Sequence, residues 1–317
     1  MRSAAALLAA VLVATLLGCG EDGAEPGASR EATLVLDFQP NAVHSGIYSA
    51  LRDGEYADRG VDLEIREPSE ATDAPRLLEA GRAELAIVTM NDLGVALERG
   101  LDLRVAAAIV NRPLGAVIAA DREAVRTPRD LEGATVGVTG LPSDDAVLDA
   151  VLESAGTNPA TVERIPIGFD SVAALSAGRL DAATAFWNAE GVMLRRLGVP
   201  TREFRIDEHG AGRYPELLLV TSGETLREEP QLVEAVAEAT RRGYRGVADD
   251  PDEELEDLLA AVPGLDEDEQ RAQLDALLDA GAFHRPDTLG ARSWLRFADD
   301  HGIVDAERVR RALGRAF

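Results

Sequence analysis

Short β-rich runs alternate with helical runs from residue 33 to residue 221, and only helical patterning follows as far as Phe317. Such alternation is typical of parallel sheets covered by helices, so the sequence predicts an α/β fold. The expected strands are 34–38, 61–65, 85–89, 103–110, 116–120, 135–139, 162–167, 182–186, 202–206 and 217–221. The expected helices between them are 45–53, 74–81, 92–100, 144–155, 171–177 and 190–197.

The strands fall into two sets, because 111–113 (Asn-Arg-Pro) interrupts the alternation. A chain that completes one sheet, starts a second and then ends in helices indicates a discontinuous first lobe around a second one. We expect lobe 1 to comprise residues 33–112 plus 208–317, and lobe 2 to comprise residues 113–207. Two crossings between the lobes would leave a cleft at the carboxyl ends of the strands, where open α/β sheets place their ligands.

The first residues indicate export. The apolar run 4–17 has the length of a signal-peptide core and is short for a membrane span. It ends in Leu-Leu-Gly followed by Cys19, which resembles a bacterial lipobox. The resemblance implies that residues 1–19 are a lipoprotein signal peptide and lipobox, that Cys19 is lipidated, and that the exported protein is anchored on the outer face of the cytoplasmic membrane. A membrane-anchoring helix, or a plain secretory signal with a chance cysteine, is the alternative. Residues 20–32 suit a flexible tether.

Composition and motifs exclude several classes of function. The chain has 32 basic and 57 acidic residues, and its formal charge of −25 argues against a nucleic-acid partner. A single cysteine excludes a disulfide framework, and the four scattered histidines lack helical metal-ligand spacing, so no metal or cofactor is expected. Dinucleotide, phosphate-loop, serine-hydrolase and zinc-protease motifs are missing, so we predict no catalytic residue.

The stretch 36–48 (LDFQPNAVHSGIY) runs from the first expected strand through a turn into a helix, whose start would aim free backbone N–H groups into the cleft. Further stretches are 60–65, 80–87, 178–183 and 186–192. Together they resemble the NMT1/THI5-like (SsuA/THI5-like) solute-binding proteins of ABC transporters, in particular those for thiamine pyrimidine precursors. Phe38 stands where this family usually has Trp, and the resemblance covers about residues 33–225.

The resemblance implies a two-lobed periplasmic-binding fold (type II), a small nitrogen heterocycle as ligand and an ABC permease as partner; we also expect a monomer. In the pyrimidine binders of this family, an aromatic residue precedes by four positions a glutamate that hydrogen-bonds the aminopyrimidine edge. Phe186 and Glu190 have that spacing. A carboxylate that accepts from an exocyclic amine and a ring N–H makes a charge-assisted, two-point contact. Phe38 or Trp187 could stack on the ring.

Each candidate competes with a structural role. The predicted ligand-binding residues are Asp37, Phe38, Asn41, His44, Asn91, Ser143, Phe186, Trp187, Glu190 and Tyr214. Phe38 and Phe186 could belong to the core, His44 could cap or pack the helix start, and Ser143 could cap a helix. Trp187 is expected to face the cleft, since it lies at a strand-to-helix turn.

Two other functions stay open. The pyrimidine synthases that resemble this chain carry a histidine in the turn after the third strand and a cysteine-rich motif, whereas this chain has Asn91 there and no cysteine after Cys19. Relatives that bind sulfonate, nitrate or riboflavin-like rings are the second alternative. Asn41, Ser143 and Arg213 could help to bind an anion, but the carboxylate of Glu190 would repel one.

Overall fold

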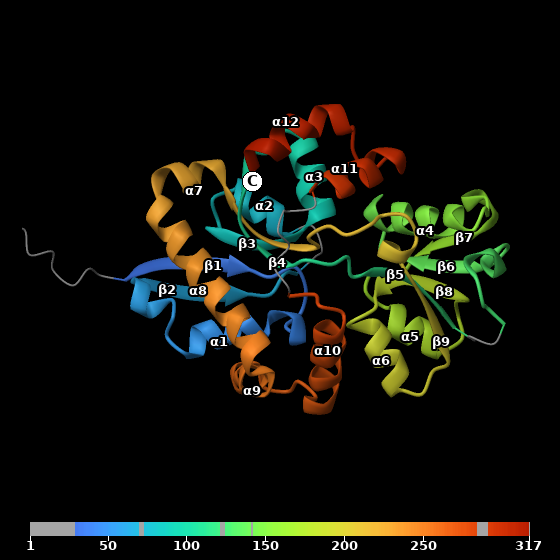
Figure 1. Cartoon of the computed structure of the whole chain (residues 1–317), viewed down its shortest axis with the longest axis horizontal. Helices are drawn as coiled ribbons and strands as arrows, with labels where there is room; N and C mark the ends of the chain where they lie inside the picture. Colours follow the sequence, from blue (N-terminus) through green and yellow to red (C-terminus); the bar gives the residue numbers. More distant parts are fainter. Residues whose placement is uncertain (1–28, 70–72, 121–123, 141, 284–290, 317) are drawn as a thin grey trace, which may run out of the picture.

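The computed structural model describes residues 29–69, 73–120, 124–140, 142–283 and 291–316. It forms two lobes side by side, one built by the first part of the chain with the C-terminal helices and the other by the middle of the chain (Figure 1). Cys19 and the whole predicted signal peptide lie outside the described residues. Within the described ranges, no helix combines the length and apolarity that crossing a membrane requires.

The first lobe is built on a five-stranded sheet in the order β2-β1-β3-β10-β4. Its strands are β1 (Arg30–Val35), β2 (Val61–Arg66), β3 (Leu85–Thr89), β4 (Leu103–Val110) and β10 (Leu217–Ser222). β1 pairs in parallel with β2 and β3, whereas β10 runs antiparallel between β3 and β4. The first four residues of β3 are all buried, as expected for a central strand covered by helices on both faces.

The second lobe repeats this pattern in a five-stranded sheet of order β7-β6-β8-β5-β9. Its strands are β5 (Gly115–Ala120), β6 (Thr135–Val138), β7 (Glu163–Pro166), β8 (Ala182–Phe186) and β9 (Thr201–Arg205). β6 is parallel to β7 and β8, and β5 is antiparallel to β8 and β9. In each lobe the antiparallel strand therefore begins at the edge where its parallel neighbour ends, so both kinds of strand bring residues to the cleft.

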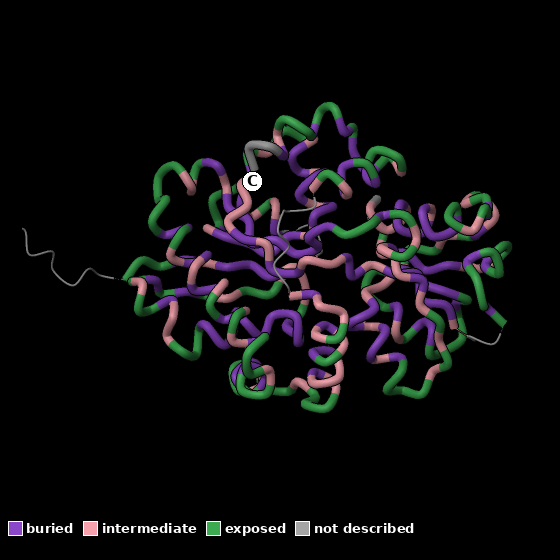
Figure 2. The backbone as a smooth tube through the Cα atoms, viewed as in Figure 1, coloured by how far each residue is buried: buried purple, intermediate pink, exposed green. Residues whose placement is uncertain are grey.

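Helices cover both sheets, and the strands between them are largely buried (Figure 2). The α-helices are α1 (Ser45–Arg52), α2 (Asp73–Glu79), α3 (Met90–Glu98), α4 (Pro142–Ser154), α5 (Ser171–Ser176), α6 (Glu190–Arg196), α7 (Gly223–Glu228), α8 (Pro230–Asp249), α9 (Pro251–Ala261), α10 (Glu267–Asp279), α11 (Ala291–Asp300) and α12 (Ala306–Ala316). The 3-10 turns are η1 (Ala42–His44), η2 (Ala57–Arg59), η3 (Pro128–Leu131), η4 (Pro159–Thr161) and η5 (Ile206–Glu208). The helical patterning predicted after residue 221 is confirmed, and these helices pack mainly on the first lobe.

Helix α8 packs closely against α1. A Cβ atom added to Gly243 would lie 1.8 Å from the backbone oxygen of Gly46, and one added to Gly46 would lie 2.7 Å from Tyr244. Glycine at both positions therefore lets the two helix backbones approach, which fixes α1 behind the β1 end of the cleft.

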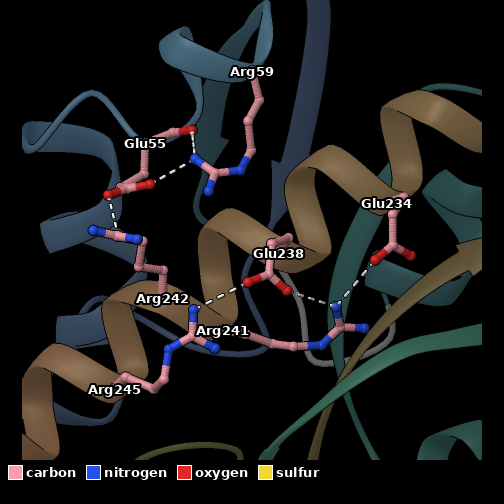
Figure 3. Close-up of polar contacts among 7 residues, drawn as sticks. All are labelled: Glu55, Arg59, Glu234, Glu238, Arg241, Arg242 and Arg245. Carbon is pink, nitrogen blue, oxygen red and sulfur yellow. Dashed lines mark hydrogen bonds and ion pairs between the residues drawn. The ribbon is translucent and has the colours of Figure 1, made fainter.

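Ion pairs reinforce the solvent side of α8 (Figure 3). The Glu55 carboxylate lies 2.5 Å from both Arg59 and Arg242, and Arg241 lies 3.3 Å from Glu238. Exposed ion pairs contribute only about 0–1 kcal/mol each. The apolar packing of α8 on the sheet therefore contributes more than its charges.

The chain crosses between the lobes twice, once between β4 and β5 and once between β9 and β10. The crossings are joined by Arg112, whose Nε lies 2.7 Å from Asp207 Oδ2, and by Glu216, whose Oε2 accepts from the Leu114 backbone N–H at 3.0 Å. This confirms the predicted discontinuous first lobe, while the boundaries at 112 and 207 stay predictions.

One predicted segment needs correction. β1 begins at Arg30, three residues inside the predicted tether 20–32, because Arg30 pairs with Val61 and its N–H donates to the Gly60 carbonyl at 2.9 Å. β1 also ends at Val35, so Asp37 and Phe38 leave the sheet and are free to line the cleft.

Candidate functional site

A cavity lies between the two lobes, with a volume of about 1210 Å³ that includes space open to solvent. Its walls come from the segments that follow β1, β3, β6, β7 and β8 and from the starts of β5 and β10. Eight of the ten predicted site residues line it: Asp37, Phe38, Asn41, Asn91, Ser143, Phe186, Glu190 and Tyr214. His44 and Trp187 do not belong to its lining.

His44 is buried behind the first wall, where it holds Asp37. Its Nδ1 accepts from the Asn41 backbone N–H at 3.2 Å, which assigns the ring proton to Nε2. That Nε2 donates to Asp37 Oδ1 at 3.0 Å. His44 thus orients the carboxylate of Asp37, which lines the cavity, and its predicted ligand contact stays a prediction.

The backbone N–H groups at the start of this helical segment are not free, contrary to expectation. The Ala42 N–H donates to Oε1 of Gln270 in α10 at 2.7 Å, and the Val43 N–H donates to the Asn41 side chain at 3.0 Å. The His44 N–H donates to the Asn41 carbonyl at 2.8 Å. This turn therefore offers side chains, not backbone donors, to a ligand.

Asn91 is held from behind by the C-terminal helices. Its Oδ1 accepts from Nε1 of the fully buried Trp294 in α11 at 2.7 Å. Tyr214 also lines the cavity, and burial raises the pKa of its hydroxyl well above the usual value. Since tyrosine stays protonated here, both residues present neutral polar groups to the cavity.

The wall of the second lobe carries Glu190, the first residue of α6. Its Oε2 accepts from the Phe186 backbone N–H at 3.1 Å, so the predicted four-residue spacing brings the pair together. Burial raises the pKa of Glu190, and the nearby carboxylate of Asp144 adds to the rise. Asp144 accepts hydrogen bonds from Thr139 and, at 3.2 Å, from the Thr184 hydroxyl.

Trp187 does not face the cleft, so this prediction is wrong. Its side chain is 0% exposed, its Nε1 donates to the Pro113 carbonyl at 3.0 Å and its N–H donates to the Leu114 carbonyl. The guanidinium of Arg205 lies 4.2 Å from the ring centroid. A side chain in a strand-to-helix turn can point toward the cleft or away from it. Here the indole packs against the segment between β4 and β5, where the chain first crosses between the lobes.

Sequence reasoning missed several residues of the lining: Asp92, Phe169, Asn188 and Glu216. Asp92 and Asp144 follow the carboxyl ends of β3 and β6, the position at which open α/β sheets bind ligands. Glu216 precedes β10, which is antiparallel to β3 with Leu217 opposite Thr89. A polar residue next to an expected strand end was thus the sequence signal that could have predicted these lining residues.

Burial shifts the carboxylates toward their neutral forms. It raises the pKa of Asp92 to about 6 and the pKa of Glu216 to about 8, and nearby carboxylates add to both shifts. Among the described residues, no Arg, Lys or His side chain lines the cavity to oppose this. The cavity therefore favours a ligand that supplies hydrogen-bond donors or positive charge and disfavours an anion. In the described part of the chain, no three or more His, Cys, Asp or Glu side chains are grouped to hold a metal ion.

Two relatives are similar to this chain in sequence. A formylaminopyrimidine-binding protein from Halalkalibacterium halodurans is 31% identical over 255 residues, which cover 80% of this chain and 77% of that protein. A 4-amino-5-hydroxymethyl-2-methylpyrimidine phosphate synthase from Legionella pneumophila is 25% identical over 236 residues, or 74% of each protein.

Solved structures resemble the fold. The alkanesulfonate-binding protein SsuA from Xanthomonas axonopodis pv. citri superposes with a TM-score of 0.68 at 15% identity, covering 90% of this chain and 98% of that one. The chain thus has the two-lobed periplasmic binding protein fold. The family model described as NMT1/THI5 like matches residues 41–254. On this match and its 31% identical relative, the chain belongs to the NMT1/THI5-like family.

Proposed function

We propose that the chain is the solute-binding component of an ABC importer and that it captures a small aminopyrimidine, a precursor of the thiamine pyrimidine. The observation that carries this proposal is the cavity between the lobes, which is lined by carboxylates including Glu190 and, in the part of the chain that the structure describes, by no basic side chain. The printed name of the 31% identical relative supports the same ligand class.

An aminopyrimidine fits the chemistry of this cavity. Its exocyclic amine and ring nitrogen lie side by side, so one carboxyl group can meet both. Glu190 is suited to this contact because the Phe186 N–H donates to its Oε2 and so orients the carboxyl group. The rings of Phe38, Phe169 and Phe186 line the same cavity and offer flat apolar surface to a heterocycle.

Binding fits the residues better than synthesis does. Where the related synthases have a histidine, this chain has Asn91, whose Oδ1 accepts a hydrogen bond from Trp294. An asparagine side chain cannot transfer a proton at neutral pH. The only cysteine of the chain is Cys19, so a cysteine-rich motif has no counterpart. A sulfonate or nitrate ligand would meet carboxylates, while no described arginine lines the cavity to pair with it, and Arg213 is exposed outside the lining.

The remaining parts of the proposal concern location and partners. We propose that Cys19 carries the lipid that anchors the protein outside the cytoplasmic membrane, and that the monomer delivers its ligand to a permease. Cys19→Ala should release the protein from membranes, as measured by fractionation with a carbonate wash. A variant that still sediments with membranes contradicts the anchor.

The ligand is tested by isothermal titration of the purified protein with 4-amino-5-hydroxymethyl-2-methylpyrimidine. Glu190→Gln should weaken binding by ~1.5–3 kcal/mol, the range for a hydrogen bond to a charged group. Glu163→Gln removes a carboxylate from the exposed side of the same lobe and should leave binding unchanged. Equal binding by wild type and Glu190→Gln contradicts the proposed ring contact, and taurine, nitrate and riboflavin test the alternatives.

A further inference from the structure

Helix α10 stands on the first lobe at the side that faces α6 of the second lobe, and the two helices are in contact (Figure 1). Asp266, the residue before α10, places its carboxylate at this contact. Its Oδ1 accepts from Arg196 Nη2 at 3.0 Å and from the Glu269 backbone N–H at 2.7 Å. The second of these bonds caps α10 and so fixes the direction of the carboxylate. Asp266 therefore joins the lobes through an oriented ion pair.

The partner of Asp266 belongs to the helix that carries the proposed ring contact. Arg196 is the last residue of α6, and Glu190 is its first. A helix of this length is a unit of about 10 Å, whose two ends move together. Separation of Arg196 from Asp266 therefore moves the carboxyl group of Glu190 away from the first lobe.

The first turn of α10 also holds the opposite wall of the cavity. Gln270 is buried, and its Oε1 accepts from the Ala42 backbone N–H at 2.7 Å. Ala42 follows Asn41, which lines the cavity. The start of α10 is thus bonded to one wall through Gln270 and to the helix of the other wall through Asp266.

The end of α10 is bonded to the first crossing between the lobes. The Ala280 carbonyl accepts from Arg112 Nη1 at 3.1 Å, and the Ala282 carbonyl accepts from the Asn111 backbone N–H at 2.7 Å. Arg112 in turn pairs with Asp207 of the second crossing at 2.7 Å. Separation of the lobes would break the contact of α10 with α6 and leave these bonds in place.

We propose that α10 is a strap that holds the two lobes together over the bound solute, and that the ion pair of Arg196 with Asp266 sets the rate of solute release. This inference rests on the proposed function and concerns the regulation of the same site. Because the two residues come from different lobes, their pair forms when the lobes meet and is absent while the solute enters. The pair therefore slows release and leaves capture unchanged.

The exposure of this pair limits the size of the effect and makes it depend on salt. The side chains of Arg196 and Asp266 are 35% and 62% exposed. A pair in such surroundings changes an equilibrium by roughly two- to five-fold. Dissolved salt screens exposed charges, so the effect should shrink as ionic strength rises.

The test measures release of 4-amino-5-hydroxymethyl-2-methylpyrimidine from the full chain by stopped-flow displacement. At low salt, Arg196→Gln and Asp266→Ser should each release the compound about two- to five-fold faster than wild type, with unchanged association rates. Serine is also a good N-cap, so Asp266→Ser removes the ion pair and keeps the cap of α10. Because both substitutions break one contact, the double variant should release the compound no faster than either single variant.

Arg195→Gln is the matched control. Arg195 is the neighbour of Arg196 in α6, but it pairs with Glu203 of β9 within the second lobe. Its replacement should leave the release rate unchanged. Equal acceleration by Arg195→Gln and Arg196→Gln, or additive effects in the double variant, would overturn the strap.

A second measurement decides the strap without a ligand. Spin labels at Asp62→Cys and Glu163→Cys, two exposed positions in different lobes, report the distance between the lobes in a Cys19→Ala background. Arg196→Gln should raise the proportion of separated lobes, and Arg195→Gln should not. Identical distance distributions for Arg196→Gln and its parent would overturn the strap, even where the compound binds. If the compound does not bind to wild type, the proposed function fails, while the distances still decide the strap.

Discussion

The ring of Phe38 meets the ring of Phe169 edge to face, with 4.9 Å between their centroids and 73° between their planes. Phe38 follows β1 in the first lobe, and Phe169 lies in the turn between β7 and α5 in the second. Phe169 is 48% exposed and lines the cavity, so the pair lies where the cavity meets solvent. This contact therefore joins the lobes in front of the proposed ligand.

Removing the Phe169 ring should speed ligand release more than it affects stability. Phe169→Ala deletes an aromatic contact between the lobes, which contributes ~0.5–1.5 kcal/mol beyond area burial. Because the side chain is half-exposed, the free energy of unfolding should change little. Stopped-flow displacement measures the release rate, and Leu197→Ala, at an exposed apolar residue outside the cavity, is the control. Equal release rates for the two variants would contradict this role.

Trp187 should affect stability rather than ligand contacts. Trp187→Ala removes a fully buried indole, a change that costs ~3–5 kcal/mol. Trp187→Phe keeps much of the packing but leaves the Pro113 carbonyl without its donor, at a cost of ~1–3 kcal/mol. Urea unfolding of both variants measures these losses. An unchanged unfolding midpoint together with weaker ligand binding would contradict this structural role and indicate that Trp187 contacts the ligand.

The fold was predictable because its signals are local. Strands such as β3 and β8 are short apolar runs between helical ones, and the break at Arg112 marks the first crossing. Phe186 and Glu190 are four residues apart, within one turn of the chain, so their spacing in the sequence also corresponds to a direct hydrogen bond in the structure. The ligand-binding roles of the site residues stay predictions.

What could not be predicted depends on partners distant in the sequence. The Gln270 side chain accepts a hydrogen bond from the Ala42 N–H, although 228 positions separate the two residues in the sequence. No local sequence pattern predicts this bond. The direction of the Trp187 ring depends on the first crossing, more than 70 residues earlier. Carboxylates are so abundant that Asp92 and Asp144 look like ordinary helix starts until the two sheets bring them to one cavity.

The carboxyl group of Glu216 should make stability fall as pH rises. Burial raises its pKa to about 8, whereas a glutamate in an unfolded chain titrates near ~4.3. Between these values the folded protein holds the extra proton, so the free energy of unfolding decreases by up to about 1.4 kcal/mol per pH unit. Above the pKa of Glu216 in the folded protein, this carboxyl group lowers the free energy of unfolding no further.

Glu216→Gln should remove that dependence, because glutamine does not titrate and its side-chain oxygen can still accept from the Leu114 N–H. Urea unfolding at mildly acidic pH and near pH 8 measures the slope for both proteins. Asp92 and Glu254 also have raised pKa values, so the informative quantity is the difference between wild type and variant. Parallel slopes would show that Glu216 is ionised in the folded protein throughout this range.

The last prediction concerns Trp294, which acts on the cavity through Asn91. Trp294 lies in α11, beyond the residues that the family model matches, and donates to Asn91 Oδ1 at 2.7 Å. It packs so closely on α3 that a Cβ atom at Gly94 would lie 2.1 Å from the ring. Glycine at this position lets the indole reach Asn91.

Trp294→Phe should leave Asn91 Oδ1 without its donor, which costs ~1–3 kcal/mol of stability, and should free the amide to turn into the cavity. Gly94→Ala should displace the same indole without altering either hydrogen-bonding group. We therefore expect both variants to change the affinity for the aminopyrimidine in the same direction, as measured by isothermal titration at a temperature well below their unfolding midpoints. Leu295→Ala, at a buried neighbour on α11 that lies outside the cavity lining, controls for general loosening of the helix. If Leu295→Ala alters affinity as much as Trp294→Phe does at equal loss of stability, the hydrogen bond to Asn91 does not position the site.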